Sequence, residues 1–411
     1  MAARTMHTRS MSGVGELDLR GGMANVVLAT LASAVGFWAW MIIAPLQARY
    51  ATEMGLTEGQ ISLMLATPVL VGSLGRVVVG ALADRLGGRR MFTALLLASV
   101  PGVLLVVVAG ENGSFGLLIT GGFVLGVAGT IFAVGIPFSS AWFPPDKRGL
   151  ATGIFGMGMI GTALAAFATP RLERVVGYVP THLIVVALLL MMAVLTWVLL
   201  RESPAWRQST EPVVPKVVGA LKLRITWEMS LLYAIVFGGF VAFSTFLPKY
   251  LVTIYPDDVD VVGAGTRAAT FAAAAVVARP IGGVLADKLG PKLITLVSLA
   301  SLVALGYVVG QQPAEGIVAG LTFILLAAAM GLGMGSVYAW IGSSSPPGRA
   351  GAVAGVVAAA GGLGGYIPPL VMGATYDPVS NSYHLGLWLL VVSAAFALVL
   401  TGLLPPGRER T

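Results

Sequence analysis

Long apolar stretches separated by short polar segments run through almost the whole chain. A helix needs about 20 apolar residues to cross the hydrocarbon core of a bilayer. Stretches of this kind lie at residues 24–46, 60–82, 91–110, 115–139, 150–168, 180–201, 229–252, 266–286, 292–310, 316–339, 350–372 and 384–404. The pattern predicts an all-α membrane protein with twelve transmembrane helices.

The longest connection between these spans, residues 202–228, is polar and contains three prolines. It divides the spans into six and six. We therefore expect an N-terminal cytoplasmic tail at 1–23, a six-helix half at 24–201, a cytoplasmic linker at 202–228, a second six-helix half at 229–404 and a cytoplasmic tail at 405–411.

The composition agrees with a lipid environment and argues against several other classes of protein. With 57% hydrophobic and 10% charged residues, a chain of 411 residues has too much apolar surface for one water-soluble core. The basic residues are dispersed among the segments between spans, which argues against nucleic-acid binding. The chain has no cysteine, and its three histidines, His7, His182 and His384, lie near the terminus or helix ends without metal-ligand spacing. We expect each histidine to lie at a surface or at the membrane interface. We expect no metal and no cofactor.

The distribution of Lys and Arg fixes an expected orientation. With both termini in the cytoplasm, 18 of the 25 Lys and Arg residues lie on that side and two lie deep within spans. The other five are assigned to the outer side or to span ends that face it: Arg49, Arg171, Arg174, Lys249 and Arg267. This is the excess that the positive-inside rule requires of cytoplasmic segments. We expect a multi-pass protein of the cytoplasmic membrane that functions as a monomer.

The two halves repeat one sequence pattern. The segment Gly80–Gly87 matches Gly283–Gly290 at an offset of 203 residues, and Arg76 matches Arg279 at the same offset. Phe132 of the fourth span matches Tyr338 of the tenth at an offset of 206. A repeat over several spans indicates that the two halves share a fold.

The loop after the second span resembles the G-x-L-A-D-R-x-G-x-R motif of the major facilitator superfamily. The resemblance implies the fold of that superfamily, with two pseudo-symmetric six-helix halves. It also implies that this loop and its repeat act as a latch between conformations. The residues that match are Asp84, Arg85, Arg89, Asp287 and Lys288. A loop that serves only to fix the orientation of the protein is the alternative for the basic residues.

Arg76 and Arg279 are the two charges that the pattern places within spans. A charge inside a membrane costs at least about 2.5–3.5 kcal/mol on the mildest insertion scale. The predicted spans contain no Asp or Glu to neutralise either arginine, so we infer that the counter-ion is the substrate. A structural arginine that donates to backbone carbonyls of neighbouring helices is the alternative for each one. Guanidinium groups bind planar oxyanions through two parallel hydrogen bonds and stay charged at any working pH. The pair therefore predicts a site for a small, flat, monovalent anion.

Four aromatic residues accompany the arginines. Phe132 and Tyr338 are repeat-related, and Tyr233 and Phe237 lie one turn apart on the seventh span. Rings above and below a planar anion would fix its plane, and the Tyr233 hydroxyl could donate a hydrogen bond. Ordinary packing remains the alternative for each ring.

With these residues the chain is similar to the nitrate/nitrite porters of the major facilitator superfamily. The likeness is carried by four segments: Arg76 placed 11 residues before Gly87-Gly-Arg-Arg90, the run Gly129-Thr-Ile-Phe132, the run Trp227–Tyr233 with Phe237, and the run Ala278-Arg279-Pro-Ile-Gly-Gly283. The resemblance implies that the paired arginines bind the anion, that Phe132 and Phe237 sandwich it and that Tyr233 donates to it.

Two glycine-rich runs complete the resemblance but differ from it at one position each. Met159 and Gly362 stand where the family has asparagine. We expect the glycines to permit close helix sliding between conformations, although generic packing would explain them equally. The residues concerned are Gly153, Gly156, Gly158, Gly161, Gly361, Gly362, Gly364 and Gly365.

The sequence thus predicts a transporter of nitrate and nitrite and not an enzyme, because no nucleophile, base and orienting residue form a catalytic set. Alternating access with nitrate/nitrite exchange is favoured, because no carboxylate lies within a span to carry a proton. Proton-coupled nitrate symport, transport of another small anion such as formate or oxalate, and a membrane sensor without flux are the alternatives.

Overall fold

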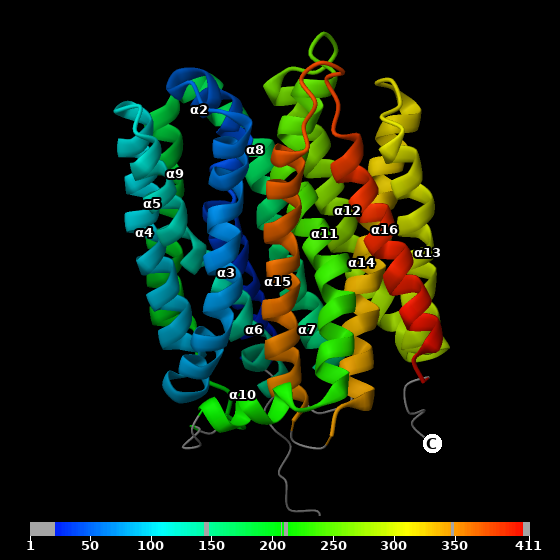
Figure 1. Ribbon diagram of the computed structural model, residues 1–411. Coiled ribbons are helices and arrows are strands. Elements are labelled where there is room, and N and C mark those ends of the chain that lie inside the picture. Colours follow the sequence, from blue (N-terminus) through cyan, green and yellow to red (C-terminus); the bar gives the residue numbers. More distant parts are fainter. Residues whose placement is uncertain (1–20, 144–147, 207, 209–212, 347–348, 406–411) are drawn as a thin grey trace, which may run out of the picture.

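A computed structural model describes residues 21–143, 148–206, 208, 213–346 and 349–405 (Figure 1). The predicted twelve spans are confirmed, because twelve helices of this part of the chain are long and apolar enough to cross a membrane. The described residues form no β-strand beyond a single bridge between Asp377 and Ser382. Most of both predicted tails and residues 207 and 209–212 of the predicted linker lie outside the described residues.

The helices of the first six spans and the helix that follows them are bounded as follows: α1 Gly22–Trp40, η2 Ala44–Leu46, α2 Gln47–Met54, α3 Glu58–Leu86, α4 Gly88–Glu111, α5 Phe115–Leu125, η3 Gly126–Thr130, α6 Ile131–Ala141, α7 Arg148–Gly156, η5 Met157–Met159, α8 Ile160–Val176, α9 Tyr178–Leu199 and α10 Val213–Leu221.

The last six spans are single helices: α11 Arg224–Ile254, α12 Val261–Leu289, α13 Pro291–Gly310, α14 Ile317–Ser344, α15 Ala350–Ala374 and α16 His384–Leu403. In Figure 1 helices α3, α4, α5 and α9 lie on the left, α11 to α16 lie at the centre and right, and α6, α7 and α8 lie near the middle. Helix α2 lies at one end of the bundle and α10 at the other. These ends are called the α2 end and the α10 end below.

The first span is not the single helix that its apolar pattern predicts. Helix α1 stops at Trp40, and the chain continues through the short 3₁₀ helix η2 into α2. Pro45 lies in the first turn of η2 and has no N–H group to continue the hydrogen-bond ladder of α1. The Trp40 indole at the break donates to the backbone oxygen of Pro68 at 2.9 Å.

Two further spans contain a 3₁₀ turn at mid-length, η3 in the fourth and η5 in the fifth. Glycine permits the close packing at η3, because a Cβ on Gly129 would come within 2.6 Å of Trp40 and one on Gly126 within 2.3 Å of Val71. Mid-helix 3₁₀ segments often mark functional positions. Both of these turns border the two buried arginines.

The two sets of spans meet along two helix pairs, α3 with α15 and α8 with α12. At the α2 end this seam is joined by ion pairs. Lys249 Nζ of α11 lies 2.8 Å from Glu58 Oε1 of α3, and Arg174 Nη2 of α8 lies 2.8 Å from Asp260 Oδ2 at the start of α12. Because these ion pairs join the two sets of spans, the seam is closed at the α2 end. Near the α10 end, by contrast, open space faces Gly351 and Gly355 of α15.

The structure corrects the sequence analysis at two polar residues. Lys249 is not a residue of an outer loop, because α11 extends past it to Ile254 and leaves it only 6% exposed. His182 is not at a surface, because it is fully buried on α9, where its Nδ1 lies 2.8 Å from the Tyr178 backbone oxygen. The length of α11 decided the position of Lys249, and the packing of α9 decided that of His182.

Candidate functional site

Arg76 of α3 and Arg279 of α12 are buried side by side at the seam between the two sets of spans. Arg76 is 2% exposed and Arg279 is 8% exposed. The centroid of the Phe132 ring lies 6.0 Å from Arg76 Cζ and 4.8 Å from Arg279 Cζ. The structure therefore brings the two repeat-related arginines to one site, although 203 residues separate them in the sequence.

Backbone carbonyls hold Arg76. Its Nη1 donates to the Ala358 oxygen of α15 at 2.8 Å, and its Nε and Nη2 both point at the Gly129 oxygen of η3 at 3.4 Å. Ala358 belongs to the last six spans and Gly129 to the first six. Arg76 thus connects the two sets of spans at mid-length of α3.

A different kind of partner holds Arg279. Its Nη1 donates to Met159 Sδ of η5 at 2.8 Å. Its guanidinium also lies against Gly156, where an added Cβ would be in van der Waals contact with Arg279 Nε at 3.6 Å. This contact also crosses the seam, because η5 lies in the fifth span and α12 in the eighth.

The predicted aromatic residues surround the two guanidinium groups. Phe237 lies 5.0 Å from Arg76 Cζ and Tyr338 lies 5.6 Å from Arg279 Cζ, measured to the ring centroids. Tyr233 stacks on Phe237 and meets Tyr338 edge to face, both at 5.0 Å between centroids. These four rings enclose the cationic site on several sides, a geometry in which cation–π attraction stabilises the guanidinium groups.

The site carries positive charge that no nearby protein carboxylate balances. Among the described residues, no Asp or Glu belongs to the buried set that includes Arg76 and Arg279. The Tyr233 hydroxyl is buried next to Arg279 and Tyr338, but in the described part of the chain no partner lies at hydrogen-bonding geometry. Two guanidinium groups, the faces of aromatic rings and a neutral hydroxyl donor together suit a small planar oxyanion.

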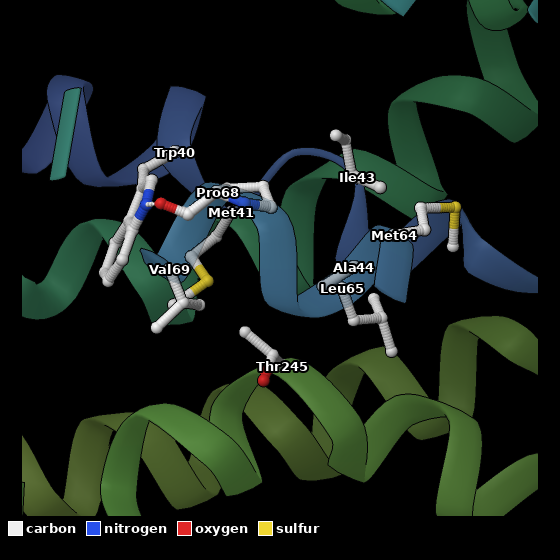
Figure 2. A pocket seen from close by; sticks show the side chains of 9 residues that line it. All are labelled: Trp40, Met41, Ile43, Ala44, Met64, Leu65, Pro68, Val69 and Thr245. Atoms are coloured by element: carbon white, nitrogen blue, oxygen red, sulfur yellow. Dashed lines mark hydrogen bonds between the residues drawn. The ribbon is translucent and has the colours of Figure 1, made fainter. Parts of the chain in front are cut away.

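A small cavity of about 10 Å³ lies at the seam between this site and the α2 end (Figure 2). Thr245 of α11 lies on one side of it. Apolar residues from α3 and from the break at the end of α1 line the other side: Trp40, Met41, Ile43, Ala44, Met64, Leu65, Pro68 and Val69. Such a volume holds about one water molecule. An anion leaving toward the α2 end would need this region to widen.

The residues of the repeated loop lie at the α10 end and not at the arginine site. Asp84, Arg85, Asp287 and Lys288 are exposed at the ends of α3 and α12. Arg89 Cζ lies 4.8 Å from the Trp197 ring centroid, and its backbone N–H donates to Glu202 Oε1 at 2.8 Å. The described contacts of Arg89 therefore run to the sixth span and to the segment that follows it.

The eight predicted glycines divide into two groups. Gly153, Gly156 and Gly362 face the other set of spans, where an added Cβ would approach Pro280, Arg279 and Ser73. The others allow close packing within one set, because their added Cβ atoms would meet α1 or α11: Gly158, Gly161, Gly361, Gly364 and Gly365. Only the first group lies where the seam could slide.

Sequence reasoning missed the ion pairs that close the α2 end. A usable signal existed for Lys249, because it lies inside the predicted span 229–252 and not after it. Asp260 caps the N-terminus of α12 by accepting from the Gly263 N–H at 2.7 Å. The hydrogen bond from Arg174, together with that from Gly263, lowers the pKa of Asp260 below its usual value.

The chain is similar to known transport proteins over most of its length. Residues 28–369 match the family model described as Major Facilitator Superfamily. The probable nitrate/nitrite transporter NarK2 of Mycobacterium tuberculosis (strain H37Rv) is 54% identical over 385 residues, which cover 94% of this chain and 97% of that protein. The nitrite extrusion protein of Bacillus subtilis is 34% identical over 377 residues, or 91% of this chain and 92% of that protein.

A solved structure has the same fold. The crystal structure of a bacterial homologue of the human lysosomal transporter Spinster, in an inward-facing and occupied conformation, aligns with a TM-score of 0.67. The alignment covers 94% of this chain and 96% of that one at 18% sequence identity. At that identity the likeness shows the fold alone.

Proposed function

This chain belongs to the nitrate/nitrite porter family of the major facilitator superfamily, and we propose that it transports nitrate and nitrite across the cytoplasmic membrane through the arginine site. Relatives named as nitrate/nitrite transporter and nitrite extrusion protein support these substrates. The site residues proposed to contact the anion are Arg76, Arg279, Phe132, Tyr233, Phe237 and Tyr338.

One observation carries the proposal. Arg76 and Arg279 come from repeat-related positions, both are buried, and both lie within 6.0 Å of the Phe132 ring centroid. Two cations held this close in a low dielectric repel one another and lose their hydration. A bound monovalent anion would lower that free energy, and the faces of the neighbouring aromatic rings suit a planar one.

Alternating access would follow from relative motion of the two sets of spans. The excess of Lys and Arg in alternate loops assigns the α10 end to the cytoplasm. The ion pairs at the α2 end would then hold the outer side closed while the inner side opens. We assign the role of an inner latch to the exposed loop residues at the α10 end, Asp84 and Arg85 with Asp287 and Lys288.

Exchange is the proposed mode of transport. Two buried guanidinium groups disfavour a transition without a bound anion, so the return step is faster when it carries the second anion. Counterflow in proteoliposomes tests this step. Uptake of labelled nitrate should require internal nitrite or nitrate. Uptake that follows an imposed pH gradient with no internal anion would instead establish proton symport.

The arginine site is tested by nitrate binding to the purified protein. Arg76→Lys and Arg279→Lys keep the charge but remove the planar fork, so each should weaken nitrate binding about tenfold or more. Arg224→Lys makes the same change at the start of α11, where the side chain is 86% exposed, and as the matched control should bind nitrate like the parent. Parental affinity in both site variants would contradict the proposed function.

A further inference from the structure

The contact between Arg279 and Met159 has no counterpart at Arg76. Both arginines reach across the seam to a glycine-rich span of the other set, yet Arg76 Nη1 donates to a backbone carbonyl and Arg279 Nη1 donates to a thioether. Sulfur in a thioether is a weak hydrogen-bond acceptor. Of the two Nη1 donors, that of Arg279 is therefore the easier one to transfer to an anion.

The thioether is held in place by the local backbone. Met159 ends the 3₁₀ turn η5 and is fully buried, and its backbone oxygen accepts from the Thr162 hydroxyl at 2.9 Å. Gly156, one turn earlier, lies against the same guanidinium, and a Cβ there would be in ordinary van der Waals contact with Arg279 Nε at 3.6 Å. An oxyanion that binds the guanidinium through two parallel hydrogen bonds at its tip would use Nη1 as one donor. The Met159 sulfur accepts from this same Nη1.

We propose that Met159 tunes the affinity of the anion site, because its Sδ competes with the anion for Nη1 of Arg279. This inference rests on the proposed function of the site. The charge-assisted bond to an oxyanion is the stronger one, so the anion displaces the sulfur, and the loss of the sulfur contact weakens anion binding by a fixed factor. Met159 therefore sets the affinity without contributing a bond of its own to the anion.

The prediction that distinguishes this role from packing is a gain of affinity on removal of the sulfur. Met159→Leu keeps the volume and apolar character and removes the acceptor. We expect the Kd of nitrate, measured by calorimetry on the purified full chain, to fall about fivefold, the value of one weak hydrogen bond. Met159→Ala removes the same sulfur with a smaller side chain and should shift the Kd in the same direction if the leucine variant does not fold.

Two comparisons complete the experiment. Met192→Leu makes the same chemical change at a buried position of α9 and should leave the Kd unchanged. In an Arg279→Lys background, Met159→Leu should no longer change the Kd, because the donor it frees is absent. An unchanged or raised Kd in Met159→Leu with normal binding by the parent overturns this inference alone. Failure of the parent to bind nitrate overturns both this inference and the proposed function.

Discussion

The guanidinium of Arg279, on α12, lies 4.8 Å from the ring centroid of Phe132, on α6, in the opposite set of spans. The same ring lies 6.0 Å from Arg76. One aromatic side chain from the first six spans therefore contacts both cations of the proposed site. A single substitution at Phe132 therefore removes an aromatic contact from both arginines at once.

Replacing Phe132 with leucine should weaken nitrate binding. Cation–π contacts contribute about 0.5–2 kcal/mol each, so the Kd of nitrate should rise by roughly three- to thirtyfold. Phe155→Leu is the control, because Phe155 is equally buried and its ring centroid lies 5.5 Å from that of Phe132. Equal Kd values for the two variants, measured by calorimetry, would show that Phe132 only fills space.

Removing the Tyr233 hydroxyl should separate binding from stability. This hydroxyl is buried without a hydrogen-bond partner among the described residues, and such a group destabilises the fold by about 1–3 kcal/mol. Tyr233→Phe should therefore be at least as heat-stable as the parent, yet bind nitrate about tenfold more weakly if the hydroxyl donates to the anion.

Tyr250→Phe is the control for this experiment. Its hydroxyl is also buried and unpartnered among the described residues, but it lies on α11 near the α2 end. It should leave nitrate binding unchanged. The role of Tyr233 is contradicted if both variants bind nitrate alike.

Removing one or the other partner of the Lys249–Glu58 ion pair should open the α2 end to different extents. Glu58→Gln leaves a cation that is 6% exposed without its partner, whereas Lys249→Gln leaves a carboxylate whose side chain is 33% exposed. Unpairing a buried charge is the costlier change, so Glu58→Gln should open the α2 end more. The chain has no cysteine, so Thr245→Cys beside the small cavity can report opening through its reaction rate with a thiol reagent.

Two results would argue against this gate. Arg224→Gln breaks an exposed pair with Glu228 near the α10 end and should not change the labelling rate of Thr245→Cys. An effect of this control as large as that of Glu58→Gln, or a larger effect of Lys249→Gln than of Glu58→Gln, would remove the pair from the closing mechanism.

The Arg174–Asp260 pair predicts a defined pH dependence. Hydrogen bonds from Arg174 and from the Gly263 N–H lower the pKa of Asp260, so the pair contributes fully above the ordinary carboxyl pKa of about 4 and is lost as the pH falls through the lowered pKa. Asp260→Asn should raise the labelling rate of Thr245→Cys equally between pH 5 and 8. The effect should be small, because both side chains are more than half exposed.

The parent should approach the Asn variant only below about pH 4. Labelling of the parent that rises between pH 7 and 5 would show that another group titrates at this end.

Gly362 should tolerate no side chain at the seam. A Cβ there would lie 2.1 Å from Ser73 Oγ of α3, and overpacking of this kind costs about 1–3 kcal/mol. Gly362→Ala should slow nitrate uptake about tenfold, and Ser73→Gly should restore part of the rate. Gly355→Ala on the same helix faces open space and should transport like the parent. Equal rates for both alanine variants would exclude a close contact at Gly362 during transport.

The sequence by itself determined the number of spans, the repeat and the residues of the arginine site. Hydropathy is a local property, so the length of each apolar run was sufficient to predict a helix. The offset of 203 residues relates Arg76 to Arg279 without any structure. Their lack of a carboxylate partner within the spans indicated an anion.

Only the tertiary structure decided which side chains meet across the seam. Arg76 contacts the Ala358 oxygen 282 residues away, Lys249 pairs with Glu58 across 191 residues, and Arg279 donates to Met159 across 120 residues. These contacts depend on how each helix is rotated about its axis and on how closely its neighbours approach. Apolar runs in lipid carry no strong periodic signal for that rotation, because both lipid and protein favour apolar side chains. The partner of each buried charge therefore became visible only in the packed bundle.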